Sequence, residues 1–439
     1  MRRSLTPYIL LALLLGLLVG WICSATLDDG GAGTARLRDI VYGLGIVTAT
    51  FLRLIKMIIA PLVFSTLVAG LAHMRDKAML GRVGLRVLLW FVGASFISLL
   101  LGLLLVNVLH PGVGLNLPLP PVGASTPVQA TGFDMAKFLT HIVPSSIIEA
   151  MAGNDVLPIV IFSLFFGIAI AAVGDAAAPV LRGVEALMAI MLKMTGYVMQ
   201  FAPIAVFAAV AGALADRGPR VIGQLGYFMG SFYLGLAVLW VLLIGLGYLV
   251  IGRRIWSLLS CVRAPLLLAF STASSEAAYP QTLAALERFG VPGRIGSFVL
   301  PLGYSFNLDG TMTYMTFASL FVAQAYGIPL SLGQQFSMLL VLMVTSKGSA
   351  GVPRASLVII AAVMPMFGIP DAGLLLILAV DHFLDMARTA TNVLGNAIAA
   401  SVVTQWEGAL GDEVPLAGDS AEASAESPME PCVEFDATK

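Results

Sequence analysis

The sequence predicts an all-α polytopic membrane protein with eight transmembrane helices and two re-entrant helical hairpins. Its 439 residues are 59% hydrophobic and only 11% charged, with a mean hydropathy of +0.95, whereas about a quarter of the residues in soluble domains are charged. Six apolar runs long enough to span a bilayer come first. The later part of the chain twice shows two short apolar runs followed by a long one, which adds two hairpins and two further spans.

The composition also argues against several classes of function. A net charge of −1, with no basic stretch interleaved with aromatic residues, argues against nucleic acid as a partner. The four histidines are scattered, so their spacing indicates no metal cluster, and no enzyme cofactor is expected. Ser274, Ser275 and His382 show no spacing that pairs a nucleophile with a base, which disfavours an intramembrane hydrolase.

The first apolar run follows Arg2 and Arg3 and resembles a secretory signal. Because apolar segments continue through most of the chain, we expect an uncleaved first helix instead. Lys and Arg accumulate on the cytoplasmic side of membrane proteins, which places both termini in the cytoplasm, although Arg217 and Arg220 fall on the outer side. The six spans are expected at about 8–25, 42–73, 84–109, 142–173, 181–213 and 224–251, with an outer loop at 111–132 and an acidic, disordered tail beyond Asp412.

Two pairs of short apolar runs predict the hairpins. Runs 258–270 and 277–289 flank the Ser-rich segment 271–276, and runs 332–345 and 355–367 flank the Ser- and Gly-rich segment 346–353. A helix of about 13 residues is about 20 Å long, shorter than a hydrocarbon core of about 30 Å. Each pair is therefore expected to enter and leave the membrane on the same side, with its tip among protein or water.

Each hairpin precedes a long apolar run that contains polar residues. In the run 298–325, Asn307 to Thr311 are poor helix formers as a group and predict local unwinding, with Asp309 as an oxygen ligand for Na⁺ or a proton carrier. Interrupted hydrophobic segments at corresponding positions of two repeats indicate a binding site near the membrane midplane in secondary transporters. A kink that tolerates glycine is the alternative, but it does not explain the aspartate.

The run 380–399 carries the densest set of polar side chains. Asp381, Asp385, Arg388, Asn392 and Asn396 are spaced four, three, four and four residues apart, so they lie within an arc of about 80° on one helical face. Each charge at the centre of a membrane helix costs about 2.5 to 3.5 kcal/mol on insertion scales. The set is interpreted either as a neutralised structural pair or as a buried site for a charged solute.

The residue types favour the second interpretation and suggest a substrate. A guanidinium such as that of Arg388 can bind a carboxylate in bidentate fashion, and Asp385 could accept hydrogen bonds from an ammonium group. Helix N-termini at the hairpin tips attract a further carboxylate, although Ser-rich loops taken alone are weak evidence. A guanidinium, backbone amides and an aspartate together fit an acidic amino acid.

Five segments resemble the dicarboxylate/amino acid:cation symporters, a family that includes bacterial glutamate transporters and animal excitatory amino acid transporters. The similarity covers nearly the whole chain. The segments are FLRLIKMIIAPLVFSTLVAG at 51–70, MQFAPIAVFA at 199–208, NLDGT at 307–311, SKGSAGVP at 346–353 and DMARTATNVLGN at 385–396.

The resemblance implies a homotrimer in the cell (inner) membrane, in contact with lipid, with the glutamate-transporter-like elevator fold. Scaffold helices 1 and 2 would occupy 1–75, transport-domain helix 3 would occupy 76–110, and the outer loop with scaffold helices 4 and 5 would occupy 111–220. The remaining transport domain would span 221–404 and the cytoplasmic tail 405–439.

The resemblance also implies roles for individual residues. Arg388 matches the binder of the substrate side-chain carboxylate and Asp385 the binder of its amino group. The full substrate-binding set would be Ser274, Ser275, Thr311, Val352, Asp385, Arg388, Thr389 and Asn392. The cation- or proton-coupling set, where a sodium ion could bind, would be Ser95, Gly303, Ser305, Asn307, Asp309, Asn392 and Asn396.

Departures from the family pattern bear on the coupling ion. Asn396 stands where sodium-coupled members carry aspartate. Ala94, next to Ser95, stands where they carry threonine, and Met315 stands where they carry glutamine or glutamate. These losses favour protons over sodium, with sodium as the alternative. Asp309, Asp385, Asp381 and Glu276 are all candidates for carrying the proton, because buried carboxylates can titrate in the working pH range.

We therefore expect a symporter that imports L-glutamate or L-aspartate with protons or sodium. The alternative is a carrier of C4-dicarboxylates such as succinate, fumarate or malate. Family members of that kind generally lack an acid at the position of Asp385. Transport of neutral amino acids is disfavoured, because Arg388 would then meet no side-chain carboxylate.

Overall fold

A computed structural model describes residues 6–27, 32–72, 77–113, 143–346, 355–378 and 380–411. Every regular element in these ranges is helical, which confirms the predicted class. Six helical stretches among them are long and apolar enough to cross a membrane. They are Pro7–Leu27, Gly33–Ala72, Gly81–Leu109, Val156–Met199, Gly226–Ile251 and Arg254–Thr272.

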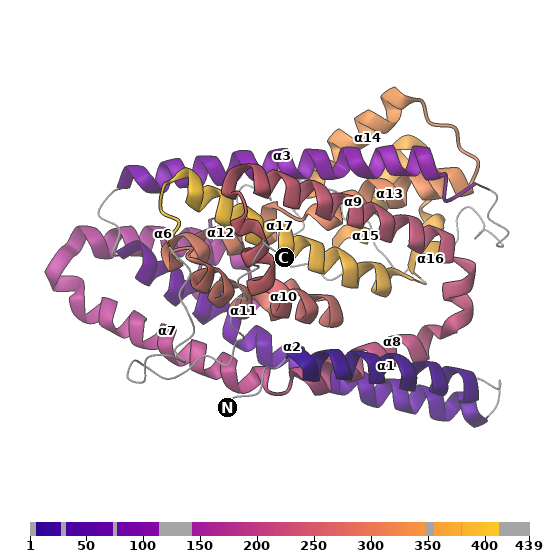
Figure 1. The fold of residues 1–439 in the computed structure, drawn as a ribbon, viewed down its shortest axis with the longest axis horizontal. Coiled ribbons are helices and arrows are strands. Elements are labelled where there is room, and N and C mark those ends of the chain that lie inside the picture. Colours follow the sequence, from indigo (N-terminus) through magenta and orange to yellow (C-terminus); the bar gives the residue numbers. More distant parts are fainter. Residues whose placement is uncertain are drawn as a thin grey trace.

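The first group of helices packs around α2. Figure 1 shows α1, α2 and α8 side by side along the lower edge of the molecule, and α2 also contacts α6 and α7. The 41 residues of α2 make it about 60 Å long, enough to tilt through a bilayer. The helices of this group are α1 (Thr6–Leu27), α2 (Ala32–Ala72), α5 (Ile147–Gly153), α6 (Val156–Val173), α7 (Ala178–Met199) and α8 (Ala202–Gln224).

Two of the predicted spans are each divided into two helices. The predicted run 142–173 breaks between α5 and α6, where Asn154 has a φ of 55° and caps the end of α5. The run 181–213 breaks between α7 and α8, because Pro203 has no N–H group to continue the helical hydrogen bonds to the carbonyl oxygen of Met199, four residues earlier. Hydropathy did not reveal either break, since apolar residues continue on both sides.

The second group of helices surrounds α17, whose residues from Met386 to Thr404 are buried. Helices α3, α9, α10, α11, α12 and α13 all contact α17, which lies at the centre of Figure 1. The helices of this group are α3 (Lys77–Leu109), α9 (Gly226–Ile251), α10 (Arg254–Thr272), α11 (Ser275–Phe289), α12 (Gly293–Phe306), α13 (Asp309–Ala325), α14 (Leu332–Thr345), α15 (Ala355–Val363), α16 (Leu374–Leu378) and α17 (Asp381–Trp406).

The first predicted hairpin corresponds to α10 and α11. These helices pack against each other and are joined by two residues, Ala273 with a φ of 47° and the N-cap residue Ser274. The prediction that both arms are too short to span was wrong for α10. Its 19 residues start at Arg254 and give a length of about 28 Å, because helical hydrogen bonds continue through polar residues where hydropathy falls.

The second predicted hairpin corresponds to α14 and α15, which also contact each other. A capping box begins α14: the Ser331 hydroxyl accepts from the Gln334 N–H, and the Gln334 side chain accepts from the Ser331 N–H. Most of the tip, residues 347–354, lies outside the described residues, and with it the predicted substrate ligand Val352.

The predicted unwinding of Asn307 to Thr311 is confirmed for the first two residues, while the other three are helical. Helix α12 ends at Phe306 and α13 begins at Asp309. Asn307 and Leu308 have φ values of −123° and −105° with positive ψ values, outside the helical region. The break is two residues long and lies against α17, since both α12 and α13 contact that helix.

Candidate functional site

The polar residues of α17 lie inside the protein, as their spacing predicted. Asp381, Arg388, Asn392 and Asn396 each expose 5% or less of their surface. Asp385 is the exception, because 39% of its side chain is exposed. The face therefore combines a buried cation with a carboxylate that ligands can reach.

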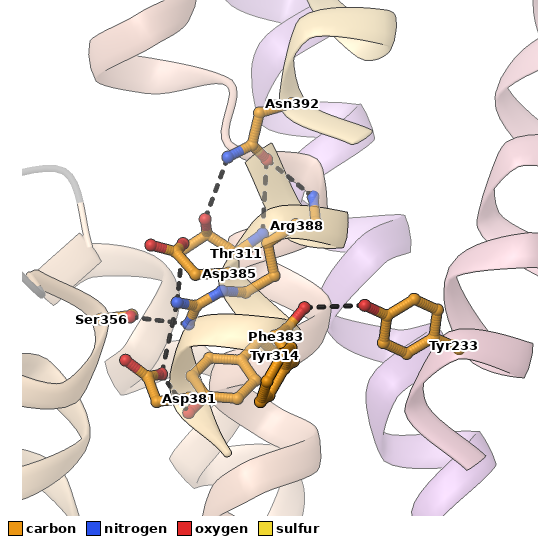
Figure 2. A network of polar contacts seen from close by, with 10 residues as sticks. Tyr233, Thr311, Tyr314, Ser356, Asp381, Phe383, Asp385, Arg388 and Asn392 are labelled. Carbon is orange, nitrogen blue, oxygen red and sulfur yellow. Dashed lines mark hydrogen bonds and ion pairs between the residues drawn. The ribbon is translucent and has the colours of Figure 1, made fainter. Parts of the chain in front are cut away.

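Arg388 lies at the centre of a polar network (Figure 2). Its Nη2 is 2.8 Å from Oδ1 of Asp385 and 3.4 Å from Oδ1 of Asp381, while its Nη1 donates to the Ser356 hydroxyl at 2.9 Å. The guanidinium carbon lies 3.9 Å from the centre of the Tyr314 ring, a cation–π contact. Tyr314 in turn donates its hydroxyl to Asp381 at 2.9 Å.

One nitrogen of this guanidinium makes none of these contacts. The Nε of Arg388 is buried and has no hydrogen-bond partner among the described residues. A buried donor without a partner costs about 1 to 3 kcal/mol. A ligand that brings an anionic acceptor would offset that cost.

Asn392 joins α17 to the start of α13. Its Oδ1 accepts from the N–H of Gly310 at 2.9 Å and of Thr311 at 3.4 Å, and its Nδ2 donates to the Thr311 hydroxyl at 3.1 Å. These N–H groups are among those that the first turn of a helix leaves without partners. A Cβ at Gly310 would lie 2.6 Å from the carbonyl oxygen of Arg388, so only glycine allows the two helices to approach this closely.

A second polar cluster forms where the α12–α13 break meets α17. The Nδ2 of Asn307 donates to Oδ2 of Asp309 and to Oδ1 of Asn396, both at 3.1 Å, and Asn396 Nδ2 lies 3.3 Å from the Asn307 carbonyl oxygen. All three side chains are fully buried. The Oδ1 of Asn307 has no donor among the described residues.

Close packing shapes this cluster. A Cβ at Gly303 would clash with Oδ1 of Asn396, and a Cβ at Gly395 would clash with Oδ2 of Asp309. Neither position can accept a side chain without moving these oxygens. The two glycines therefore allow the amide and the carboxylate to meet the break in α13.

Helix α3 supplies hydroxyl groups to the same cluster. Ser98 donates to Oδ1 of Asp309 at 3.4 Å, and its carbonyl oxygen accepts from the Thr313 hydroxyl at 3.0 Å. Ser95 donates to the carbonyl oxygen of Phe306 at 3.4 Å. The predicted coupling residues Ser95, Gly303, Asn307, Asp309 and Asn396 thus come from four helices and the break between two of them, and Ser305 is also buried on α12.

The tip of the first hairpin contains Ser274 and Ser275. The Ser274 hydroxyl accepts from the Ala277 N–H at 3.2 Å and so caps α11, which gives it a structural role. Ser275 begins α11 and is half-buried. Thr389 is buried on α17 next to Arg388. Among the residues that the structure describes, no hydrogen bond or ion pair ties these three to Arg388 or Asp385.

Sequence reasoning missed four residues of these networks. Tyr314 and Ser356 contact Arg388, and Ser98 and Thr313 join the Asp309 cluster. Tyr314 lies three residues after Thr311 and thus one turn along the same face of α13, a spacing that could have indicated it. The other three lie within apolar runs where single hydroxyl residues are common.

The fold and the site define a class of protein. Membrane-spanning helices, broken at a buried carboxylate and packed around a buried arginine, are the architecture of a secondary transporter rather than of an enzyme. Among the described residues, no group of three or more His, Cys, Asp or Glu side chains could hold a metal ion.

Comparison with known proteins agrees with this class. The family model described as "Sodium:dicarboxylate symporter family" matches residues 5–406. The chain belongs to this family and is a multi-pass membrane symporter, which confirms the resemblance inferred from the five segments.

Individual relatives carry two kinds of name. A "C4-dicarboxylate transport protein" of Deinococcus radiodurans is 38% identical over 413 residues, covering 93% of this chain and 90% of that protein. A "Proton/sodium-glutamate symport protein" of Bacillus caldotenax is 38% identical over 419 residues, covering 94% and 97%. A "C4-dicarboxylate transport protein 2" of Mesorhizobium japonicum is 42% identical over 372 residues, covering 84% of each chain.

Proposed function

We propose that this symporter imports acidic amino acids, L-glutamate or L-aspartate, together with protons. Its site would use Arg388 and Asp385 for the substrate and a carboxylate on the same group of helices for the proton. Names of relatives support both glutamate and C4-dicarboxylates as substrates, so the choice rests on the geometry of this chain.

The observation that carries the proposal is the contact of 2.8 Å between Arg388 and Asp385, in which the arginine is buried and the aspartate is 39% exposed. An acidic amino acid brings a carboxylate for the arginine and an ammonium for the aspartate. Arg388 and Asp385 would then each exchange the other for a charged group of the substrate, so neither charge would be left uncompensated. An uncompensated charge is costly where little water is present.

A C4-dicarboxylate would satisfy only half of this pair. Its carboxylate could bind Arg388, but Asp385 would then face a second anion without a cation to balance it. That arrangement is unfavourable at short distance. The remaining contacts of Arg388 with Asp381 and Ser356 hold the guanidinium in place while the partner changes.

The unpartnered atoms support the same assignment. The free Nε of Arg388 is a donor for a substrate carboxylate, and the free Oδ1 of Asn307 is an acceptor beside the Asp309 carboxylate. The donor at Arg388 fits an anion and the acceptor at Asn307 fits a cation, and a symporter must bind both. Thr311, Asn392 and Thr389 would complete the substrate shell with the hairpin tips at Ser274, Ser275 and Val352.

The coupling ion follows from the chemistry of Asn396. Its Nδ2 donates toward the Asn307 carbonyl oxygen, so this side chain presents an N–H donor among the oxygens where a carboxylate would present only acceptors. A bare cation is repelled by such a donor, which disfavours sodium in this cluster and favours protons as the coupling ion. Sodium is the second candidate, favoured by the free Oδ1 of Asn307 and by relatives named proton/sodium-glutamate symport proteins.

The packing supports an elevator arrangement of the two groups of helices. Helices α1, α2, α5, α6, α7 and α8 would form the scaffold, in a homotrimer of the cell (inner) membrane with both termini in the cytoplasm. The group around α17, with α3, α9 and both hairpins, would move as the transport domain. This division follows the boundaries predicted at 75, 110, 220 and 404.

The test is uptake of labelled L-aspartate and L-glutamate into proteoliposomes, under a pH gradient or a sodium gradient imposed one at a time. Excess unlabelled succinate would be the competitor. We expect inward protons to support uptake without sodium, and an amino acid to compete better than succinate. Succinate competing as well as L-aspartate would favour the C4-dicarboxylate alternative, and strict dependence on sodium would refute proton coupling.

Arg388→Lys tests the assigned site directly. Lysine keeps the charge but lacks the planar fork that binds a carboxylate in bidentate fashion. We expect uptake of acidic substrate to fall by at least tenfold, while the purified variant elutes like the wild type from size-exclusion chromatography. Unchanged uptake would refute the role of Arg388.

A further inference from the structure

An ion pair links the two groups of helices at the first hairpin. Nζ of Lys56 on α2 lies 3.9 Å from Oε2 of Glu276 on α11. Helix α2 packs with α1, α6, α7 and α8 and also contacts α11 and α12 of the second group, whereas α11 packs mainly with α10, α12 and α17. The pair therefore crosses the boundary along which an elevator movement would slide.

Lys56 lies well inside a helix that is long and apolar enough to cross a membrane. Lys56 is 16 residues before the end of α2, about 24 Å along the helix, and its neighbours Ile55, Ile58 and Ile59 are buried in the core. Glu276 is in the first turn of α11, directly after the tip serines. An ion pair is screened less by water and salt in such surroundings than at an aqueous surface.

Sliding of the hairpin past α2 would separate these charges. The side chains of Lys56 and Glu276 are 54% and 33% exposed, so neither is locked in place by packing. Separation would leave a carboxylate on the moving hairpin without its counter-ion, a state that is unfavourable in an apolar environment. A neutral glutamic acid needs no counter-ion and would move freely.

We propose that Glu276 carries the coupling proton and that its ion pair with Lys56 holds the hairpin until the proton binds. The proton comes from water on the entry side and bonds to a carboxylate oxygen of Glu276, while Lys56 keeps its positive charge. On the other side the proton returns to water. This inference rests on the proposed function, and it chooses one proton carrier among the candidates that the sequence left open.

The other groups near Glu276 are compatible with this role. Lys56 faces it from α2, and Tyr304 of α12 lies within electrostatic reach. The Tyr304 hydroxyl is buried and has no hydrogen-bond partner among the described residues.

The test compares two assays of the full-length protein in proteoliposomes. One measures accumulation of labelled L-aspartate under a pH gradient, which requires net proton movement. The other measures exchange of labelled for unlabelled L-aspartate at equal pH, which does not. We expect Glu276→Gln to lose at least tenfold in accumulation while exchange stays within about twofold of the wild type.

Lys56→Gln and a charge swap refine the test. Without Lys56 nothing holds the unprotonated hairpin, so accumulation should fall while exchange is retained. Arg53→Gln, which removes an exposed cation one turn earlier on α2, should leave both unchanged. The double variant with Lys56→Glu and Glu276→Lys restores a pair but removes the acid from the hairpin, and it should still fail to accumulate substrate.

Several results would overturn the proposal. They are retained accumulation in Glu276→Gln, equal loss of exchange and accumulation in that variant, recovery of accumulation in the charge swap, and wild-type accumulation with sodium alone. The last would leave the substrate assignment intact. A wild type that exchanges no acidic amino acid would instead refute the proposed function and this proposal together.

Discussion

Replacing Asp385 with asparagine should change the choice between substrates more than it changes the fold. The carboxylate is 39% exposed and lies 2.8 Å from Arg388, so the proposed ammonium contact is a charge-assisted hydrogen bond at a partly solvated position. Such bonds contribute about 1.5 to 3 kcal/mol when buried, and solvent screening reduces this one to the lower end. A loss of about 1.5 to 2 kcal/mol corresponds to about a 10- to 30-fold weaker affinity for L-aspartate.

The same substitution should leave succinate affinity unchanged or improved, because succinate has no ammonium and no longer meets a second carboxylate beside Arg388. The assay is competition of unlabelled L-aspartate and succinate against labelled substrate in proteoliposomes. The quantity of interest is the ratio of the two inhibition constants. Asp175→Asn, at an exposed position in the turn after α6, is the control. If both substrates weaken equally in Asp385→Asn, Asp385 does not bind an amino group.

Three further predictions concern the packing of α17 and the cluster beside it. Asn396→Asp replaces an N–H donor near Asp309 with a second carboxylate, so uptake should become stimulated by sodium at fixed pH, and no response to sodium would contradict the assigned cluster. Gly310→Ala should destabilise the protein by about 1 to 3 kcal/mol through overpacking, since its Cβ would lie 2.6 Å from the Arg388 carbonyl oxygen. The matched control is Gly226→Ala, where a Cβ meets nothing within 4 Å, and equal thermal stability of the two variants would refute this account. Tyr314→Phe removes the 2.9 Å hydrogen bond to Asp381 and should cost about 1.5 to 3 kcal/mol, visible as a lower melting temperature, whereas an unchanged one would mean that this bond contributes little.

The glycines explain how so much polarity fits between apolar helices. Gly303 and Gly395 each leave room for an oxygen of the opposite element, and Gly310 leaves room for the backbone of α17. Polar groups brought this close satisfy one another, which limits the cost of removing them from water. The cluster is therefore as much a product of packing as of charge.

The sequence by itself determined the class of the protein and the main polar positions. Spacings of three and four on an apolar helix place Asp381, Arg388, Asn392 and Asn396 on one face, and the structure buries all four. The weak helix formers after Phe306 predicted the break that the structure shows at Asn307 and Leu308. These features depend on local preferences and periodicity, which a single chain segment carries within itself.

Only the tertiary structure decided which of these residues meet. Tyr314 and Ser356 reach Arg388 from other helices, and the pairing of Lys56 with Glu276 joins residues more than 200 positions apart. The breaks at Asn154 and Pro203 and the length of α10 were also hidden, because helix ends do not coincide with the ends of apolar runs. Such contacts depend on how whole helices pack, and no local pattern in the sequence records the distance between two helices.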